Sequence, residues 1–232
     1  MVDQPEIISA QFARTWWKEL MANSVALVDD AAALARNASP GRAQALVVLA
    51  LEELAKARWL YDAANWEWTR PLGLYGQEPA PSESVAVPDG LRSTRRLHTD
   101  KLKVAEQFAS GVAGFWDPTR RHEYYQLADL ETFETAARQR NVDKQAGFYV
   151  DRAGDTITSP LGVPDSGVAG AILHAAQVVE MQLIEDHTRQ QDAPDDALID
   201  SVQDLHWAIM PHAHPEEFAA FLERVADDET AP

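Results

Sequence analysis

The most continuous hydrophobic stretch of the chain runs from Ser39 to Tyr61. Ser39 is a favourable N-cap residue, and Pro40 suits the first helical position, where its missing N–H costs nothing. From Ala43 onward, the only charged residues in about five helical turns of largely apolar surface are Glu52, Glu53, Lys56 and Arg58. This pattern predicts a central helix that is buried almost all round.

Charged positions on this helix fall on two different faces. Placed on a helical wheel at roughly 100° per residue, Glu52 and Lys56 share a narrow polar strip as an i, i+4 pair in the favourable order. Glu53 instead falls on an apolar face, beside Leu46 and Leu49. A carboxylate in that position needs a partner from another helix or a raised pKa.

Periodic apolar positions predict further helices on both sides of this one, at residues 7–36, 91–115, 118–138, 166–189, 196–210 and 215–227. Two short β-prone runs, 148–150 and 156–158, predict a small hairpin. The expected fold class is therefore all-α, with a hairpin insertion near 147–158. We expect one domain over residues 1–232, with its core at about 7–190 and a C-terminal helical extension at 195–228.

Residues 70–90 contain four of the thirteen prolines and three glycines, which predicts a long loop. Compact domains rarely keep a loop of about twenty residues without a role. It could serve as a lid, as a segment that binds a partner, or only as a connector.

The helix expected at 91–115 carries the counterpart of Glu53. Lys101 projects from the middle of its apolar face, and His98 lies at the edge of that face. Two opposite charges on core-facing sides of neighbouring helices are most simply explained if Glu53 and Lys101 pair with each other. The expected buried polar network consists of Glu52, Glu53, Lys56, His98 and Lys101.

The absence of cysteine excludes disulfides, thiolate metal sites and cysteine nucleophiles, and it fits a reducing cytosol. The N-terminus lacks a basic region followed by an apolar run, and no apolar stretch reaches the roughly 18 residues of a membrane span. We therefore expect a soluble, cytoplasmic protein without a membrane partner.

The formal net charge of −17 is unevenly distributed. Residues 92–152 carry 11 basic and 9 acidic side chains, whereas residues 153–232 carry 2 basic and 16 acidic ones. Five basic residues face one acid over twelve positions in the middle segment: Arg92, Arg95, Arg96, Lys101 and Lys103. Such a patch can contact phosphate, or it can be an ordinary solvated helix start.

Three histidines near the C-terminus, His206, His212 and His214, are of a type that binds metals. Pro211 and Pro215 make this segment a helix connector, however, and nothing in the sequence defines a ligand geometry. The chain also lacks a Glu-x-x-His pair, a glycine-rich phosphate loop and a serine-hydrolase elbow. We expect no metal and no cofactor, and the role of the three histidines stays open.

Three motifs follow one another along the chain: ALEELAKA at 50–57, His98-x-x-Lys101, and Lys144-x-x-Gly-Phe-Tyr-Val-Asp before Ser159-Pro160. Together they resemble the AbiV family of abortive-infection proteins, whose helical core is similar to that of the HEPN superfamily. The resemblance covers roughly residues 10–190 and implies a HEPN-like helical bundle. Within the third motif, at the expected hairpin, the family residues are Lys144, Gly147, Tyr149 and Asp151.

The same resemblance implies a role in bacterial defence against phage, in which growth or translation is arrested in the infected cell. It also implies a homodimer and control by another protein, for which a phage product is one candidate. RNA or the ribosome is the implied target.

Many HEPN proteins are metal-independent ribonucleases with an Arg-x4-6-His motif, and the spacing of Arg92 and His98 satisfies it. In that chemistry a histidine moves a proton from the ribose 2′-OH while an arginine stabilises the phosphorane charge. Arg92 and His98 are therefore candidate catalytic residues. Arg95, Arg96 and Lys103 are candidate RNA contacts.

The alternative is a non-enzymatic interaction protein that binds the translation machinery or a phage protein. In that case His98 has only a structural role in the buried network.

Overall fold

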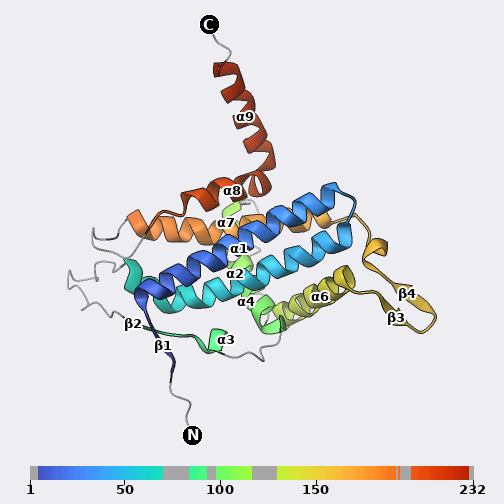
Figure 1. Ribbon diagram of the computed structural model, residues 1–232, viewed down its shortest axis with the longest axis horizontal. Helices are drawn as coiled ribbons and strands as arrows, with labels where there is room; N and C mark the ends of the chain where they lie inside the picture. The colour runs from blue at the N-terminus through green and yellow to red at the C-terminus, as the bar shows by residue number, and fades with distance from the viewer. Residues whose placement is uncertain are drawn as a thin grey trace.

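The computed structural model describes residues 5–69, 84–92, 98–116, 130–191, 193 and 200–229. Two long helices, α1 (Ala10–Arg36) and α2 (Pro40–Thr69), run side by side through its centre (Figure 1). The side chain of Ser9 caps α1 by accepting a hydrogen bond from the Phe12 N–H at 3.1 Å. Between the helices, Ala38 has a φ of 53°, which lets the chain reverse within a few residues.

Helix α2 is enclosed by its neighbours, as the sequence predicts. Helices α4 (His98–Trp116), α6 (Leu130–Phe148) and α7 (Val168–Gln191) all pack against it, in addition to α1. Val47, Val48 and Leu54 consequently have no exposed surface. These contacts make α2 the common wall of one hydrophobic core.

The C-terminal helices extend beyond this bundle. Helix α8 (Gln203–Ala213) lies across α1 and α7, and it places Ile209 in the core. Helix α9 (Pro215–Glu229) points away from the bundle, and its main contacts are with α8 (Figure 1). Helix α9 agrees closely with the helix expected at 215–227, whereas α8 begins at Gln203, later than the expected residue 196, and continues through Pro211 to Ala213.

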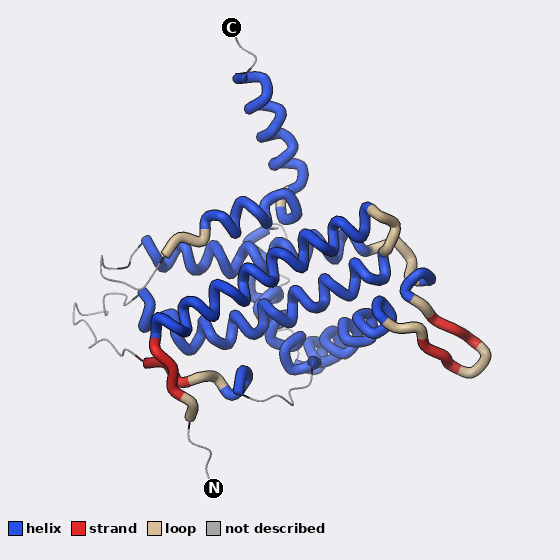
Figure 2. Tube along the Cα trace, in the orientation of Figure 1, coloured by secondary structure: helices blue, strands red, loops and turns tan. Residues whose placement is uncertain are grey.

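Two small antiparallel strand pairs accompany the helices in the described part of the chain (Figure 2). Strands β3 (Asp151–Ala153) and β4 (Thr156–Thr158) form the expected hairpin, with Gly154 in the left-handed conformation at φ 61°. The first strand begins three residues later than predicted, because α6 continues to Phe148.

The pair formed by β1 (Ile7–Ser9) and β2 (Ser84–Ala86) was missed by the sequence analysis. Residues 7–9 were expected to be helical, and residues 84–86 were placed in the loop at 70–90. Strands of three residues are too short for an alternating pattern to be recognised. Their pairing depends on tertiary contact instead, since Val85 is buried against the core.

Two predicted helix boundaries need correction. The helix expected at 91–115 is replaced by α3 (Asp89–Arg92) and, from His98 onward, α4, while residues 93–97 lie outside the described part. The helix expected at 118–138 corresponds in part to α6, which begins at Leu130 among the described residues and extends well beyond 138. A short 3-10 helix, η2 (Pro160–Gly162), connects the hairpin to the segment before α7. No described helix is both long enough and apolar enough for a membrane span.

Candidate functional site

Glu52 of α2 is the centre of a buried polar cluster that joins three helices. Only 3% of this residue is exposed. Its carboxylate accepts hydrogen bonds from Lys144 of α6 and from Nδ1 of His98, which lies 2.9 and 2.7 Å from the two oxygens. Nζ of Lys101 lies 3.5 Å from Oε2 of Glu52. His98 and Lys101 come from the first turn of α4, so the cluster ties both α4 and α6 to α2.

A close crossing of α2 and α6 allows Lys144 to reach Glu52. A Cβ atom built on Gly147 of α6 would lie 2.1 Å from the carbonyl oxygen of Gly41 and 2.7 Å from Cβ of Ala45. Only glycine fits at that distance, because real side chains cannot approach a backbone oxygen so closely. Lys144 lies one turn earlier on the same buried side of α6, directed at α2.

The Glu52 carboxylate is held in its charged form. Burial alone would raise its pKa, but the hydrogen bonds from Lys144 and His98, together with the positive charge of Lys144, outweigh burial and lower the pKa. Lys144 is itself almost fully buried, and Lys101 is mostly buried. Two ammonium groups therefore lie beside the one carboxylate that contacts His98.

The contact with Glu52 also determines how His98 can act. A carboxylate only accepts hydrogen bonds, so Nδ1 of His98 must carry a proton. The neutral ring then has its lone pair on Nε2. Because 53% of the His98 side chain is exposed, this geometry can present a base to an incoming molecule. A carboxylate that orients a histidine through Nδ1 is the arrangement used by general-base dyads.

The expected ion pair between Glu53 and Lys101 is wrong. Glu53 pairs with Lys56 on its own helix at 2.5 Å, and Lys101 contacts Glu52 instead. The wheel placed Glu52 on the polar strip, yet Glu52 is the more buried of the two glutamates. The structure thus brings Glu52, His98 and Lys101 together, and leaves Glu53 and Lys56 as a separate, partly exposed pair.

The candidate RNA-binding residues are spread over several elements. Arg92 ends α3 and pairs with Asp89, so it does not share a helix with His98. Lys103 lies on α4 and forms an ion pair with Glu134 of α6 at 3.0 Å. Arg95 and Arg96 fall outside the described residues.

The residues of the third sequence motif do not all lie in the hairpin. Lys144 and Gly147 belong to α6, and Tyr149 follows that helix with its side chain exposed. Asp151 begins β3, and its carboxylate accepts a hydrogen bond from the Arg152 N–H at 2.8 Å. The motif therefore serves two purposes: its first half completes the Glu52 cluster, and its second half starts the hairpin.

A second buried ion pair was missed by the sequence analysis. Arg14 of α1 donates two hydrogen bonds to Asp186 of α7, at 2.7 and 2.9 Å, and both side chains are almost completely buried. The guanidinium group also stacks on Trp17, 4.6 Å from the ring centroid, and bonds the Asp200 carboxylate at 3.1 Å. A basic residue within the apolar stripe of helix 7–36 was the available signal.

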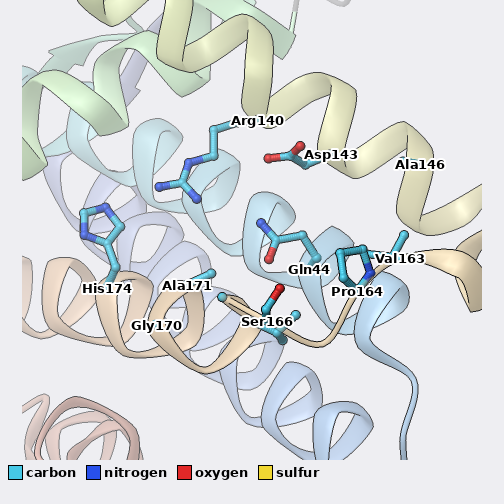
Figure 3. Close-up of a pocket in the computed structure, with 12 residues that line it drawn as sticks. Gln44, Arg140, Asp143, Ala146, Val163, Pro164, Ser166, Gly170, Ala171 and His174 are labelled. Atoms are coloured by element: carbon cyan, nitrogen blue, oxygen red, sulfur yellow. The ribbon is translucent and has the colours of Figure 1, made fainter.

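A pocket of about 490 Å³ opens between α6, α2 and the start of α7 (Figure 3). Arg140, Asp143, Gln44 and Ser166 line it, and Nε2 of His174 is buried without a hydrogen-bond partner. Burial, followed by the charge of Arg140, lowers the pKa of His174. Arg140 bonds Glu106 of α4 at 3.0 Å, so this wall of the pocket also couples α4 to α6.

The three C-terminal histidines make separate contacts. Nε2 of His212 lies 3.1 Å from Oδ1 of Asp29, and Nε2 of His214 lies 2.7 Å from Oε2 of Glu180. Burial lowers the pKa of His206. Over the described residues, no three or more His, Asp or Glu side chains gather as a metal site would require.

Comparison with protein-family models identifies a family for this chain. The model of the family described as AbiV, a HEPN-type family, matches residues 12–180, which is most of the chain. The matched range contains Glu52, His98, Lys101 and Lys144. No curated protein and no solved structure matches this sequence significantly.

Proposed function

Because the chain belongs to the AbiV family and so has a role in abortive infection, we propose that it arrests growth or translation in phage-infected cells by cleaving RNA at His98. The observation that carries this proposal is the contact between both Glu52 oxygens and Nδ1 of His98. It orients a half-exposed imidazole with Nε2 as the available base.

In the proposed reaction, Nε2 of His98 takes the proton of a ribose 2′-OH. The 2′ oxygen bonds to the adjacent phosphorus while the bond from phosphorus to the 5′ oxygen breaks. The leaving oxygen takes a proton from solvent, and His98 returns its own proton to solvent. The products are a 2′,3′-cyclic phosphate and a 5′-hydroxyl, and the step needs no metal.

Charge stabilisation would come from the basic residues that precede and follow His98 in the sequence. A pentacoordinate phosphorane is strongly negative, and cations placed beside it lower the barrier. Arg92 is the candidate for this role, with Arg95, Arg96 and Lys103 contacting the flanking phosphates. Lys101 adds positive charge near the imidazole, since its Nζ lies 3.5 Å from the Glu52 carboxylate.

A histidine substitution tests this proposal directly. We expect His98→Ala to abolish phage protection and the cleavage of cellular RNA on infection, whereas His187→Ala, at an exposed histidine of α7, should leave both intact. Protein purified from phage-infected cells should cleave RNA in the presence of EDTA and lose that activity with the same substitution. Full protection by a folded His98→Ala variant would rule out the nuclease.

That outcome would favour the second candidate, a non-enzymatic protein that binds the translation machinery or a phage protein. One observation supports it: Lys144, Lys101 and His98 together satisfy Glu52, as a purely structural network requires. A ribosome co-sedimentation assay with wild-type and His98→Ala protein distinguishes the two functions. Equal binding together with equal protection identifies the binding protein.

Control by a second protein completes the proposal, because an effector that stops translation must be silent before infection. The family relationship supports such control, and a phage-encoded protein is the natural trigger. Co-expression with single phage genes, scored by growth arrest, would identify it. Growth arrest by the chain alone at its normal level would contradict this part.

A further inference from the structure

Helix α9 carries an apolar stripe that the rest of the described chain leaves uncovered. Leu222 is 50% exposed, Val225 is 40% exposed and Phe221 is 37% exposed, and all three lie on one side of the helix with Phe218. The ring of Phe221 lies 6.0 Å from Trp207 of α8, itself 47% exposed. The stripe therefore continues from α9 onto α8. Clusters of exposed aromatic and aliphatic side chains of this kind mark interaction surfaces.

The bundle of the same chain does not cover this stripe. Pro215 begins α9 only one residue after α8, and the helix then points away from the bundle (Figure 1). An isolated helix of 15 residues is marginal in water. A covering surface from another molecule would supply the packing that the helix lacks.

We propose that α9 pairs antiparallel with α9 of a second copy of this chain, with Trp207 at each end of the contact. The charges beside the stripe indicate that a second copy of the chain covers it. Glu217 and Arg224 are seven residues apart, so they lie on the same flank of the stripe. Both are exposed, and within the described residues neither forms an ion pair.

In an antiparallel pair with twofold symmetry, like flanks of the two helices face each other. Glu217 of one copy then lies opposite Arg224 of the other, and the symmetry repeats the ion pair. A parallel pair would place this flank against Ala219 and Ala226 and lose both ion pairs. In the antiparallel pair, Ala219 and Ala226 lie on the other flank of the stripe, where their small side chains let the two helix backbones approach closely.

The other charges agree with a second copy as the occupant. Glu216 and Glu223 lie on the face opposite the stripe, where they do not meet the second helix. A basic protein would complement those acids but would meet Arg224 with like charge. The total charge of −17 on each copy opposes association, so we expect a dimer of modest affinity that requires physiological ionic strength.

Sedimentation equilibrium of the full chain over a micromolar concentration series tests the pairing. We expect the wild-type chain to dimerise reversibly. Leu222→Asp should raise the dissociation constant of the dimer at least tenfold. Arg224→Glu should weaken the dimer, because two glutamates then face each other. The double variant Glu217→Arg, Arg224→Glu should restore it, since both ion pairs re-form in reversed polarity.

The matched control is Glu223→Arg on the opposite face, which should leave the dissociation constant within about twofold. Circular dichroism and thermal unfolding verify that each variant keeps its fold. A wild-type chain that stays monomeric, or a dimer that persists in Leu222→Asp, overturns the proposal. A double variant that dimerises no better than Arg224→Glu alone would exclude the antiparallel register.

Discussion

Lys144 of α6 donates a hydrogen bond to Glu52 of α2 across 92 positions of the chain, and both side chains are almost fully buried. Each of these charges would be costly to bury alone, because neither could keep its water. Together with His98 and Lys101 they form a cluster in which Lys144 of α6 helps to lower the pKa of Glu52 against the effect of burial. The carboxylate that orients the proposed base thus depends on a lysine from another helix.

Removing one member of this pair should be severely destabilising. We expect Lys144→Met to lower the free energy of unfolding by about 3–5 kcal/mol, because Glu52 is left buried with less compensating charge. The same change at Lys103, whose partner Glu134 is exposed, should leave the free energy of unfolding close to that of the wild type. Urea unfolding of both variants measures the difference. Equal losses would mean that the Glu52 cluster is solvated.

The crossing of α2 and α6 makes a second prediction. Gly147→Ala should destabilise the protein by about 1–3 kcal/mol or more, since the new Cβ meets the Gly41 carbonyl and must push the helices apart. Gly111→Ala is the control, because a Cβ on that residue of α4 meets no atom within 4 Å. Loss of glycine flexibility should make the control about 0.5–1 kcal/mol more stable. Thermal unfolding should therefore shift in opposite directions for the two variants.

The pair of Arg14 and Asp186 should behave as one unit. Arg14→Leu alone is expected to cost about 3–5 kcal/mol, because the buried Asp186 carboxylate would lose its charge partner and the two hydrogen bonds from Arg14, and keep the one from Gln190. The double variant Arg14→Leu, Asp186→Leu should be more stable than Arg14→Leu. A double-mutant cycle measures the coupling. Strictly additive losses would show that the two side chains do not depend on each other.

His174 should make stability depend on mildly acidic pH. Its pKa is lowered in the folded protein, chiefly by burial and then by Arg140, so the unfolded chain binds the proton more readily. Stability is therefore fully present above the unfolded pKa of about 6.5 and falls as the pH drops below it. We expect His174→Gln to flatten the pH dependence of the unfolding free energy between about pH 7 and pH 5. His187→Gln, at an exposed site, should retain the wild-type slope.

Local pattern was enough for most helices and for the hairpin. Helix α2 begins at Pro40 behind Ser39, and α9 begins at Pro215, because capping and proline geometry act within a few residues. The end of α6 was misplaced because its last turns are stabilised by contact with α2 at Gly147, which no local signal reports. The strands β1 and β2 were missed for the same reason, since each depends on the other.

The candidate site was likewise predicted in part from local pattern and decided in part by tertiary packing. Sequence spacing alone put His98 and Lys101 on one side of a helix and an unusual carboxylate in α2, because helical periodicity determines which residues share a face. It wrongly chose Glu53 over Glu52 as the buried carboxylate, since α2 is apolar on nearly every side and its own pattern does not rank those sides. Only the tertiary structure decided this, by the face on which α4 and α6 pack. There Lys144 and His98 supply the hydrogen bonds and charge that offset the cost of burying Glu52.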